Sequence, residues 1–410
     1  MEEETVANTC RTNTTKIECE NNIRTKTPAA VLGMIDVTDD TPAPSEPTKT
    51  YKHAVYPFPL GLDPRECNGY PPAYIKNEPE HELNFFLTDE SDQTQQDEGG
   101  KKKRGRIFKK MLRKEVKKNA YIKPERSLAC SLASREEISF EQLQNQVSSS
   151  LSENNFKTKP VIIICHGAMS WRNQMILANL SAELLRCVDA HILRFDFTGN
   201  GHSKGEWSMG NFNREYEDLF TVIDFVTNSI GCQVRCVIGH SKGSASILNC
   251  ASRVAKQELE DGKDVTCKCF VNLAGRYRVP EIHDPMSKFG DEQRAEMMKK
   301  GFFQITSTWG DGRIFKVTKE DLDAYKLQSV ADTPKVLVHL RKDSSIRVLT
   351  IHGHEDEVVS VQNAFRFDEE IANHSLHVIK QANHNFNGIK YLDEMVEQIV
   401  TFYKSVYNEA

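Results

Sequence analysis

The pentapeptide Gly239-His240-Ser241-Lys242-Gly243 constrains this chain more than any other stretch. An apolar, strand-like run ending at Ile238 leads into it, and a segment of small residues suited to a helix follows. Gly-x-Ser-x-Gly between a strand and a helix predicts a nucleophile elbow, a turn so tight that its serine adopts a strained backbone conformation. Gly239 and Gly243 lack the Cβ atoms that would collide with neighbouring backbone in such a turn. The alternative for the pentapeptide taken alone is a glycine-rich connection capped by serine.

The whole chain, with 410 residues, is long enough for one large domain with additions or for two domains. Its apolar content of 39% is low for a globular protein and predicts that part of the chain is not packed. A net charge of −5 argues against binding nucleic acid over the whole surface. The acidic start has no apolar segment after it, and no run reaches the length of a membrane span. We therefore expect a cytoplasmic protein without a signal peptide or a transmembrane helix.

The eleven cysteines are scattered and include no Cys-x-x-Cys pair. Cys232 with Cys236, or Cys267 with Cys269, lacks the matching second half of a zinc site. Because most cysteines lie in apolar runs, we expect reduced, buried thiols. We expect no metal and no cofactor.

Residues 1–119 are expected to form a disordered N-terminal region. Ten of the fifteen prolines fall between Pro28 and Pro79, among polar residues without a sustained apolar period. The segment Tyr51–Leu60 is an exception, because it is rich in aromatic and aliphatic residues. It is either a docking segment that lies on the folded domain or a few apolar residues in a loose tail.

The segment Lys101–Lys118 has eleven basic side chains and a single acidic one, Glu115. Its five large apolar residues recur at helical spacing, which predicts a basic helix with a narrow apolar stripe. Such a helix can bind an anionic membrane surface or calmodulin, and Lys101–Arg106 can serve an import receptor and give a nuclear location. A solvated, charged linker is the alternative.

From residue 120 to 410 the composition is that of a globular domain. Val161–Cys165 is wholly apolar and largely β-branched, which is typical of a strand buried on both faces of a parallel sheet. Strands and helices then alternate up to a closing helix, Ile389–Tyr407, and this predicts an α/β fold with a doubly wound, mostly parallel sheet. The alternation breaks between about residues 276 and 345. A helix and a hairpin there predict a small cap insertion placed to cover the elbow.

A serine hydroxyl is a weak nucleophile near neutral pH, so Ser241 needs a base within hydrogen-bond reach and an acid that orients the base. In a sheet of this kind the acid and then the histidine follow the serine, each in a loop after a strand. The loop after Arg347–Ile351 supplies Asp356 as the acid, and the loop after the next strand supplies His384 as the base. The adjacent acidic residues Glu355 and Glu357 remain alternatives to Asp356.

The negative oxygen that forms when serine attacks an acyl group needs two fixed donors. The N–H of Lys242, directly after the serine, is one candidate. The loop after Val161–Cys165 supplies the other, the N–H of Ala168, and Gly167 lets the backbone approach there. We expect His166 and the glycine-containing loop Arg194–Ser203 to brace this oxyanion loop.

Together these segments resemble the α/β-hydrolase superfamily, and in particular its serine-aminopeptidase-like and plant-type esterase/lipase branch. The resemblance extends from about Ser127 to the C-terminus and is carried by His166-Gly167, Asp196–Ser203, Gly239–Gly243, Val271–Tyr277, His352–Asp356 and Asn383-His384. It implies a serine hydrolase that works through an acyl-enzyme, with Ser241, Asp356 and His384 as its catalytic triad. Lys242 departs from many lipases, which have a smaller residue after the serine.

The resemblance is specific to the superfamily and weak on the substrate. We expect a small or medium acyl ester, with a thioester or an aminopeptidase substrate as alternatives. The acidic groups that hold a free amine in prolyl aminopeptidases have no identifiable counterpart in this sequence. The alternative from a different functional class is a non-catalytic scaffold that has a hydrolase fold and works through its basic segment.

Overall fold

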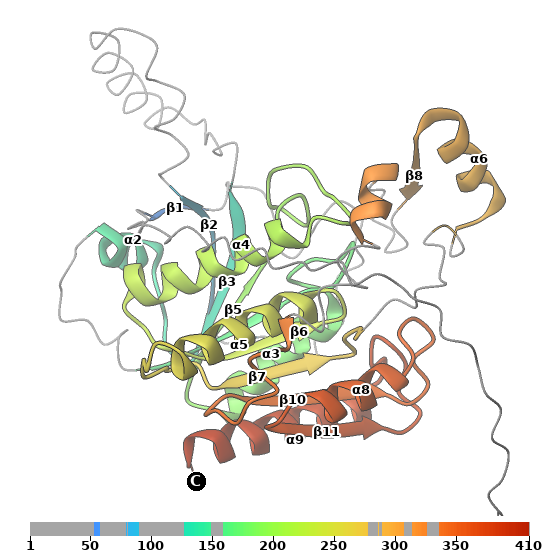
Figure 1. Ribbon diagram of the computed structural model, residues 1–410. Coiled ribbons are helices and arrows are strands. Elements are labelled where there is room, and N and C mark those ends of the chain that lie inside the picture. The colour runs from blue at the N-terminus through green and yellow to red at the C-terminus, as the bar shows by residue number, and fades with distance from the viewer. Residues whose placement is uncertain are drawn as a thin grey trace, which may run out of the picture. The chain divides into compact units, whose positions relative to one another are not determined.

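The computed structural model describes one compact unit, which lies within residues 50–410. Its described residues build a nine-stranded sheet with helices on both faces and a separate two-stranded hairpin (Figure 1). The predicted α/β class is therefore confirmed. The described residues are 53–57, 79, 81–89, 127–148, 159–277, 286, 289–306, 314–325 and 336–409.

The larger part of the sheet is parallel, in the strand order β5-β4-β6-β7-β10-β11. The central strands consist mostly of apolar residues and are buried on both faces, because helices cover each side of the sheet. All six strands run the same way, so their carboxyl ends meet at one edge of the sheet. In chain order they are β4 (Val161–Cys165), β5 (His191–Phe195), β6 (Val234–His240), β7 (Cys269–Leu273), β10 (Arg347–Gly353) and β11 (His374–Ile379).

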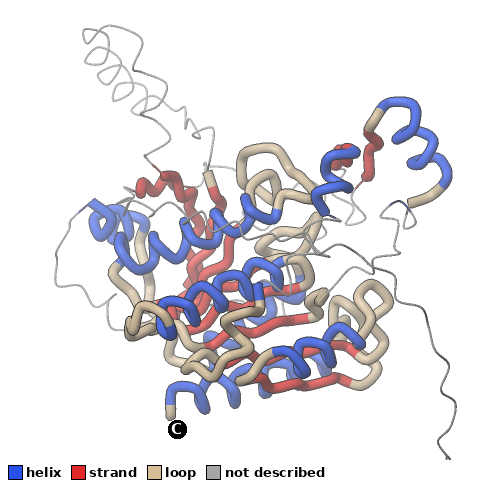
Figure 2. Tube along the Cα trace, viewed as in Figure 1, coloured by secondary structure: helices blue, strands red, loops and turns tan. Residues whose placement is uncertain are grey.

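Helices cover the two faces of the sheet in separate groups (Figure 2). Along β4, alternate residues enter different cores: Ile163 belongs to the cluster that contains α4, α5 and α8, and Ile162 to the one that contains α3 and α9. None of the described helices combines the length and the apolar character that a membrane crossing requires. The helices are α2 (Phe140–Ser148), α3 (Met175–Cys187), α4 (Phe212–Asp224), the π-helical η3 (Phe225–Ile230), α5 (Gly243–Leu259), α8 (Gln362–Glu370) and α9 (Ile389–Tyr407).

An antiparallel edge of three strands, in the order β1-β2-β3, adds to the sheet beside β5. Two of them, β1 (His53–Pro57) and β2 (His81–Asp89), come from the region expected to be disordered, whereas β3 is Leu128–Ser134. The expectation of disorder through residue 119 is therefore wrong for these two segments. Within Tyr51–Leu60, the described residues favour the docking alternative. The basic segment Lys101–Lys118 lies outside the described residues.

The predicted cap insertion contains α6 (Asp291–Lys300) and a hairpin of β8 (Phe302–Thr306) and β9 (Ile314–Thr318). The insertion has a small core of its own, in which Phe303, Val317 and Leu322 are buried. A hydrogen bond from the Ser208 hydroxyl to Asp321 joins the insertion to the loop that precedes α4. The expected helix and hairpin are thus confirmed, and the turn expected at Gly310–Gly312 lies outside the described residues.

Candidate active site

The turn after β6 has the geometry of a nucleophile elbow. Ser241 has a positive φ of 52°, and its N–H donates to the carbonyl oxygen of Leu273 at 2.8 Å. A Cβ on Gly239 would lie 2.6 Å from the carbonyl oxygen of Gly243, and one on Gly243 would lie 2.5 Å from that of His166. Only glycine fits at either position, and the strained serine is presented at the start of α5, as the sequence predicts.

The structure brings Ser241, His384 and Asp356 into one hydrogen-bonded row. His384 Nε2 lies 2.9 Å from Ser241 Oγ, and His384 Nδ1 lies 2.7 Å from Asp356 Oδ2. An ionised carboxylate only accepts hydrogen bonds, so Nδ1 must carry the proton and the Nε2 lone pair faces the serine hydroxyl. This arrangement lets His384 remove a proton from Ser241.

Asp356 is held as an anion by several donors. Its Oδ1 accepts the N–H groups of Val358 and Val359 at 2.8 and 2.7 Å, and His352 Nε2 lies 3.1 Å from Oδ2. Burial alone would raise the pKa of Asp356, but the hydrogen bonds from His352, His384 and Val359 lower it well below its ordinary value. The competing residues Glu355 and Glu357 are exposed. The contact with His384 therefore favours Asp356, as expected.

Two further buried histidines support this row, and the sequence patterns that contain them assign them no role. His240, inside the elbow, uses its Nε2 to contact the carbonyl oxygen of His384 at 3.0 Å. Burial, together with the nearby His384, lowers the pKa of His240 to about 3, so His240 is neutral and donates this hydrogen bond. His352 contacts both Asp356 and the carbonyl oxygen of Val359. Both residues lie at the carboxyl ends of buried strands, which is the signal that could have identified them.

The two predicted oxyanion donors lie beside Ser241. Within the described part of the chain, neither the Ala168 N–H nor the Lys242 N–H has a hydrogen-bond acceptor. Both residues line the same cavity as Ser241. A Cβ on Gly167 would lie 3.0 Å from Ser241 Cβ, so a larger residue there would push the loop away from the elbow. The two N–H groups are available to an oxygen atom bound next to Ser241.

His166 fixes the loop that carries Ala168. Its Nδ1 lies 2.8 Å from the carbonyl oxygen of Gly167, and its Nε2 accepts the N–H of Phe197 at 3.0 Å. Burial lowers the pKa of His166 to about 4, so the ring is neutral and makes one hydrogen bond as a donor and one as an acceptor. This is the bracing role that the sequence predicts.

A buried network of charged groups supports the same loop from beneath. The backbone N–H of Arg172 donates to Asp196 Oδ1 at 2.6 Å, and its guanidinium contacts both Asp196 and the Ser131 hydroxyl of β3. Neighbouring Arg194 donates to the carbonyl oxygen of Arg172 and forms an ion pair with Glu82 of β2. The expected bracing by the loop after β5 is therefore confirmed, and it continues into the antiparallel edge.

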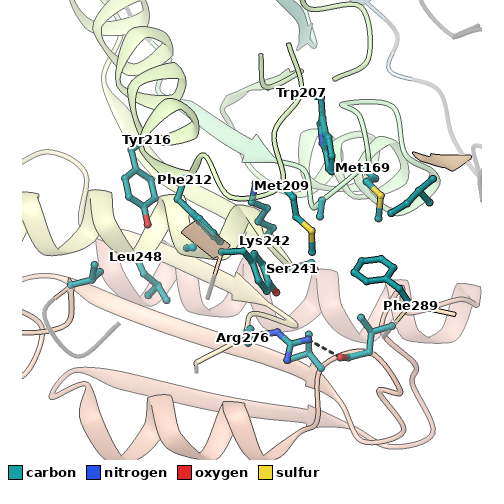
Figure 3. A pocket seen from close by; sticks show the side chains of 17 residues that line it. Met169, Trp207, Met209, Phe212, Tyr216, Ser241, Lys242, Leu248, Arg276 and Phe289 are labelled. Atoms are coloured by element: carbon teal, nitrogen blue, oxygen red, sulfur yellow. Dashed lines mark hydrogen bonds between the residues drawn. The ribbon is translucent and has the colours of Figure 1, made fainter. Parts of the chain in front are cut away.

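A cavity of about 280 Å³ adjoins Ser241 (Figure 3). Its walls are mainly apolar: Trp207, Met209 and Phe212 come from the loop before α4 and from α4 itself, and Phe289, Ile305 and Tyr325 from the insertion. The insertion thus lies over the elbow, as predicted. Among the described residues, no group of His, Cys, Asp and Glu side chains could hold a metal ion.

The Lys242 side chain turns from the elbow towards α4. Its Nζ lies 2.7 Å from Glu215 Oε1 and 4.7 Å from the centre of the Phe212 ring. Both partners of this ion pair are largely buried. Burial raises the pKa of Glu215, and the nearby Lys242 opposes that rise. The charge of Lys242 is therefore balanced inside the protein.

Comparison with known proteins finds a match to a family model and solved structures of similar fold. Residues 157–263 match the family model of the serine aminopeptidases S33. Est1E of Butyrivibrio proteoclasticus, in a structure with bound ferulic acid, is 19% identical with a TM-score of 0.51, covering 71% of this chain and 100% of Est1E. Mouse α/β hydrolase domain-containing protein 10 is 16% identical with a TM-score of 0.45, covering 70% of this chain and 98% of the mouse chain.

A yeast relative extends the similarity at the level of sequence. Protein YDL057W of Saccharomyces cerevisiae is 23% identical over 270 residues, which cover 62% of this chain and 77% of the yeast protein. The family match includes the elbow, and the likeness to Est1E covers the described fold. The elbow, the parallel sheet and the likeness to Est1E show that the chain has the α/β-hydrolase fold, and its residues 157–263 resemble the serine aminopeptidase S33 family.

Proposed function

We propose that the protein is a serine hydrolase that cleaves small or medium acyl esters through an acyl-enzyme. The observation that carries the proposal is the placement of His384 between Ser241 Oγ, at 2.9 Å, and Asp356 Oδ2, at 2.7 Å. A serine with both a base and an orienting acid is an activated nucleophile.

The proposed reaction begins when His384 Nε2 takes the hydroxyl proton of Ser241 while Oγ attacks the ester carbonyl carbon. Asp356 stabilises the imidazolium that forms. The N–H groups of Ala168 and Lys242 donate to the negative oxygen of the tetrahedral intermediate. The intermediate collapses when His384 returns the proton to the leaving alcohol, which gives the acyl-enzyme. Water, activated by the same histidine, then releases the acid and restores Ser241.

The lining of the cavity favours an ester over an amino-terminal peptide. Its walls are largely apolar, which suits an acyl chain, and its volume of about 280 Å³ is at the small end of ligand pockets. A serine aminopeptidase needs carboxylates that hold a free substrate amine. Among the described residues that line the cavity, the charged ones are Lys242 and Arg276, both cationic. A thioester meets the same requirements as an ester and is the second candidate.

Labelling with a fluorophosphonate, followed by a panel of 4-nitrophenyl esters of increasing acyl length, tests the proposal. We expect covalent labelling of the wild-type protein and of Ser405→Ala, a control on the exposed face of α9, and none of Ser241→Ala. Turnover should favour the shorter esters of the panel. Labelling that persists in Ser241→Ala, or wild-type protein that neither labels nor hydrolyses any ester, would contradict it and favour the scaffold reading.

A further inference from the structure

The two cations that line the cavity differ in how they are neutralised. Lys242 forms a largely buried ion pair with Glu215 at 2.7 Å. Arg276 follows β7, and among the described residues its guanidinium donates one hydrogen bond, to the carbonyl oxygen of Val358 at 2.9 Å. No carboxylate lies within ion-pair distance of Arg276 in the described part of the chain. The cavity therefore has one uncompensated positive charge among its described lining residues.

The position of Arg276 connects this charge to the substrate site. Arg276 and Ser241 line the same cavity, and Figure 3 shows the Arg276 side chain below Ser241, with a dashed line for its hydrogen bond. A single hydrogen bond to Val358 leaves most of the guanidinium donors without an acceptor among the described residues. Because the rest of the described wall is mainly apolar, an anion at this wall would have Arg276 as its main charged partner.

We propose that Arg276 binds a carboxylate group of the substrate, so that the ester cleaved at Ser241 also carries an anionic substituent. This inference rests on the proposed function. A planar guanidinium matches a carboxylate through two parallel N–H···O hydrogen bonds, and one cation suits one negative charge. Among the described lining residues Lys242 is paired and the other walls are mainly apolar, so they provide no second free cation of the kind that a doubly charged group would favour. The substrate class is thus an acidic acyl ester.

A purely structural role for Arg276 makes a different prediction. In that case its task is to join the loop after β7 to the loop that carries Asp356, through Val358. Glutamine can still donate a hydrogen bond to that carbonyl but has no charge, and lysine keeps the charge without the planar fork. The two variants therefore separate the loss of charge from the loss of the hydrogen bond.

Direct binding tests the inference without hydrolysis. Ser241→Ala protein is titrated in a calorimeter with 4-phenylbutyrate and with the neutral, similarly shaped 4-phenylbutyramide. We expect the carboxylate to bind about tenfold more tightly, a difference of about 1.4 kcal/mol. Adding Arg276→Gln should abolish the preference, and Arg276→Lys should retain part of it. Arg366→Gln removes an exposed arginine that pairs with Glu369 on α8, and should leave the preference unchanged.

Either of two results would overturn the inference. The first is equal binding of the carboxylate and the amide. The second is a preference that survives Arg276→Gln, because the carboxylate would then occupy the oxyanion donors or contact His384. Failure of this inference can be distinguished from failure of the proposed function. In the first case the wild-type protein is still labelled at Ser241 by the fluorophosphonate, and in the second case it is not.

Kinetics then locate the anionic group on the substrate. Mono-4-nitrophenyl glutarate, with its carboxylate on the acyl side, is compared with 4-nitrophenyl pentanoate. In the second pair, 3-(butanoyloxy)benzoate, with its carboxylate on the leaving group, is compared with its methyl ester. We expect kcat/KM to favour the anionic member of one pair about tenfold, and Arg276→Gln to remove that preference. If neither pair shows a preference in the wild-type protein, Arg276 does not select the substrate.

Discussion

The parallel part of the sheet and its antiparallel edge contribute to the site in different ways. Strands β4, β6, β10 and β11 end at the same edge of the sheet, and the loops that follow them carry the proposed oxyanion donors, Ser241, Asp356 and His384. Strands β1, β2 and β3 supply none of the residues that line the cavity. They supply partners to buried arginines instead: Glu82 pairs with Arg194, and the Ser131 hydroxyl accepts from Arg172.

This difference follows from strand direction. Parallel strands present every carboxyl end on one side, so reactive groups far apart in the sequence converge there. Neighbouring antiparallel strands alternate in direction and cannot gather their ends in this way, but they can place side chains beneath the loops of the parallel part. Changes in the parallel part should therefore affect turnover, whereas changes at the edge should affect stability first.

The largest effect is expected at Ser241. Ser241→Ala should lower kcat by about a million-fold if the three residues act as a unit, while the melting temperature shifts little, because alanine fits the same turn. Ester hydrolysis and thermal unfolding are measured on the same preparation. Residual activity near that of the wild type would show that the parallel part does not act through this serine.

The next largest effect is expected at Asp356, and not at the neighbouring carboxylate Glu355. Asp356→Asn should lower kcat by about ten-thousand-fold, because asparagine favours the wrong tautomer of His384 and cannot stabilise the imidazolium. The matched change at exposed Glu355, Glu355→Gln, should cost less than about threefold on the same scale. Equal losses in the two variants, measured as kcat for one ester, would contradict the assignment of the acid.

Truncation tests the antiparallel edge. A chain that starts at residue 120 lacks β1 and β2, so Arg194 loses its partner Glu82 and the apolar face of β2 is lost. Breaking a buried ion pair by removing one partner costs about 3–5 kcal/mol, so we expect aggregation or a strongly lowered melting temperature. A chain that starts at residue 50 should behave like the full chain. A stable, fully active product from residue 120 would show that the edge is dispensable.

A point change examines the same contact without removing a strand. Glu82→Gln keeps a hydrogen-bond acceptor for Arg194 but leaves its charge unpaired. We expect the melting temperature to fall by about 5 °C or more, with KM little changed, because the residue does not line the cavity. A change in kcat without a change in stability would instead connect the edge directly to the chemistry.

The last expected effect concerns pH. Burial lowers the pKa of His191, on β5 beside the edge, from 6.5 to about 4. Between these values the unfolded chain takes up a proton that the folded chain does not, so stability falls as the pH drops from 6.5 towards 4. Each pH unit in this range costs about 1.4 kcal/mol for this group. His191→Gln should make the melting temperature less dependent on pH, and exposed His354→Gln should not.

The sequence predicts the parallel part of this molecule well and the edge poorly. The row of Ser241, His384 and Asp356, the elbow glycines and the loop that carries Ala168 can be predicted because each has a fixed spacing relative to a strongly apolar strand. Strand β1 is only five residues long, and residues 90–127 separate β2 from β3 in the sequence. No local pattern therefore shows that β2 pairs with β1 and with β3. The roles of His240 and Glu82 depend on contacts between distant segments. Local periodicity contains no information about such contacts.

The pairing of β2 with β3 has a consequence for the basic segment between them. Leu87 lies opposite Leu128, so the strands that precede and follow residues 90–126 are neighbours in the sheet. A single cut between residues 90 and 126 would leave two fragments that only non-covalent strand pairing keeps together. That pairing would then depend on protein concentration, whereas in the intact chain it does not.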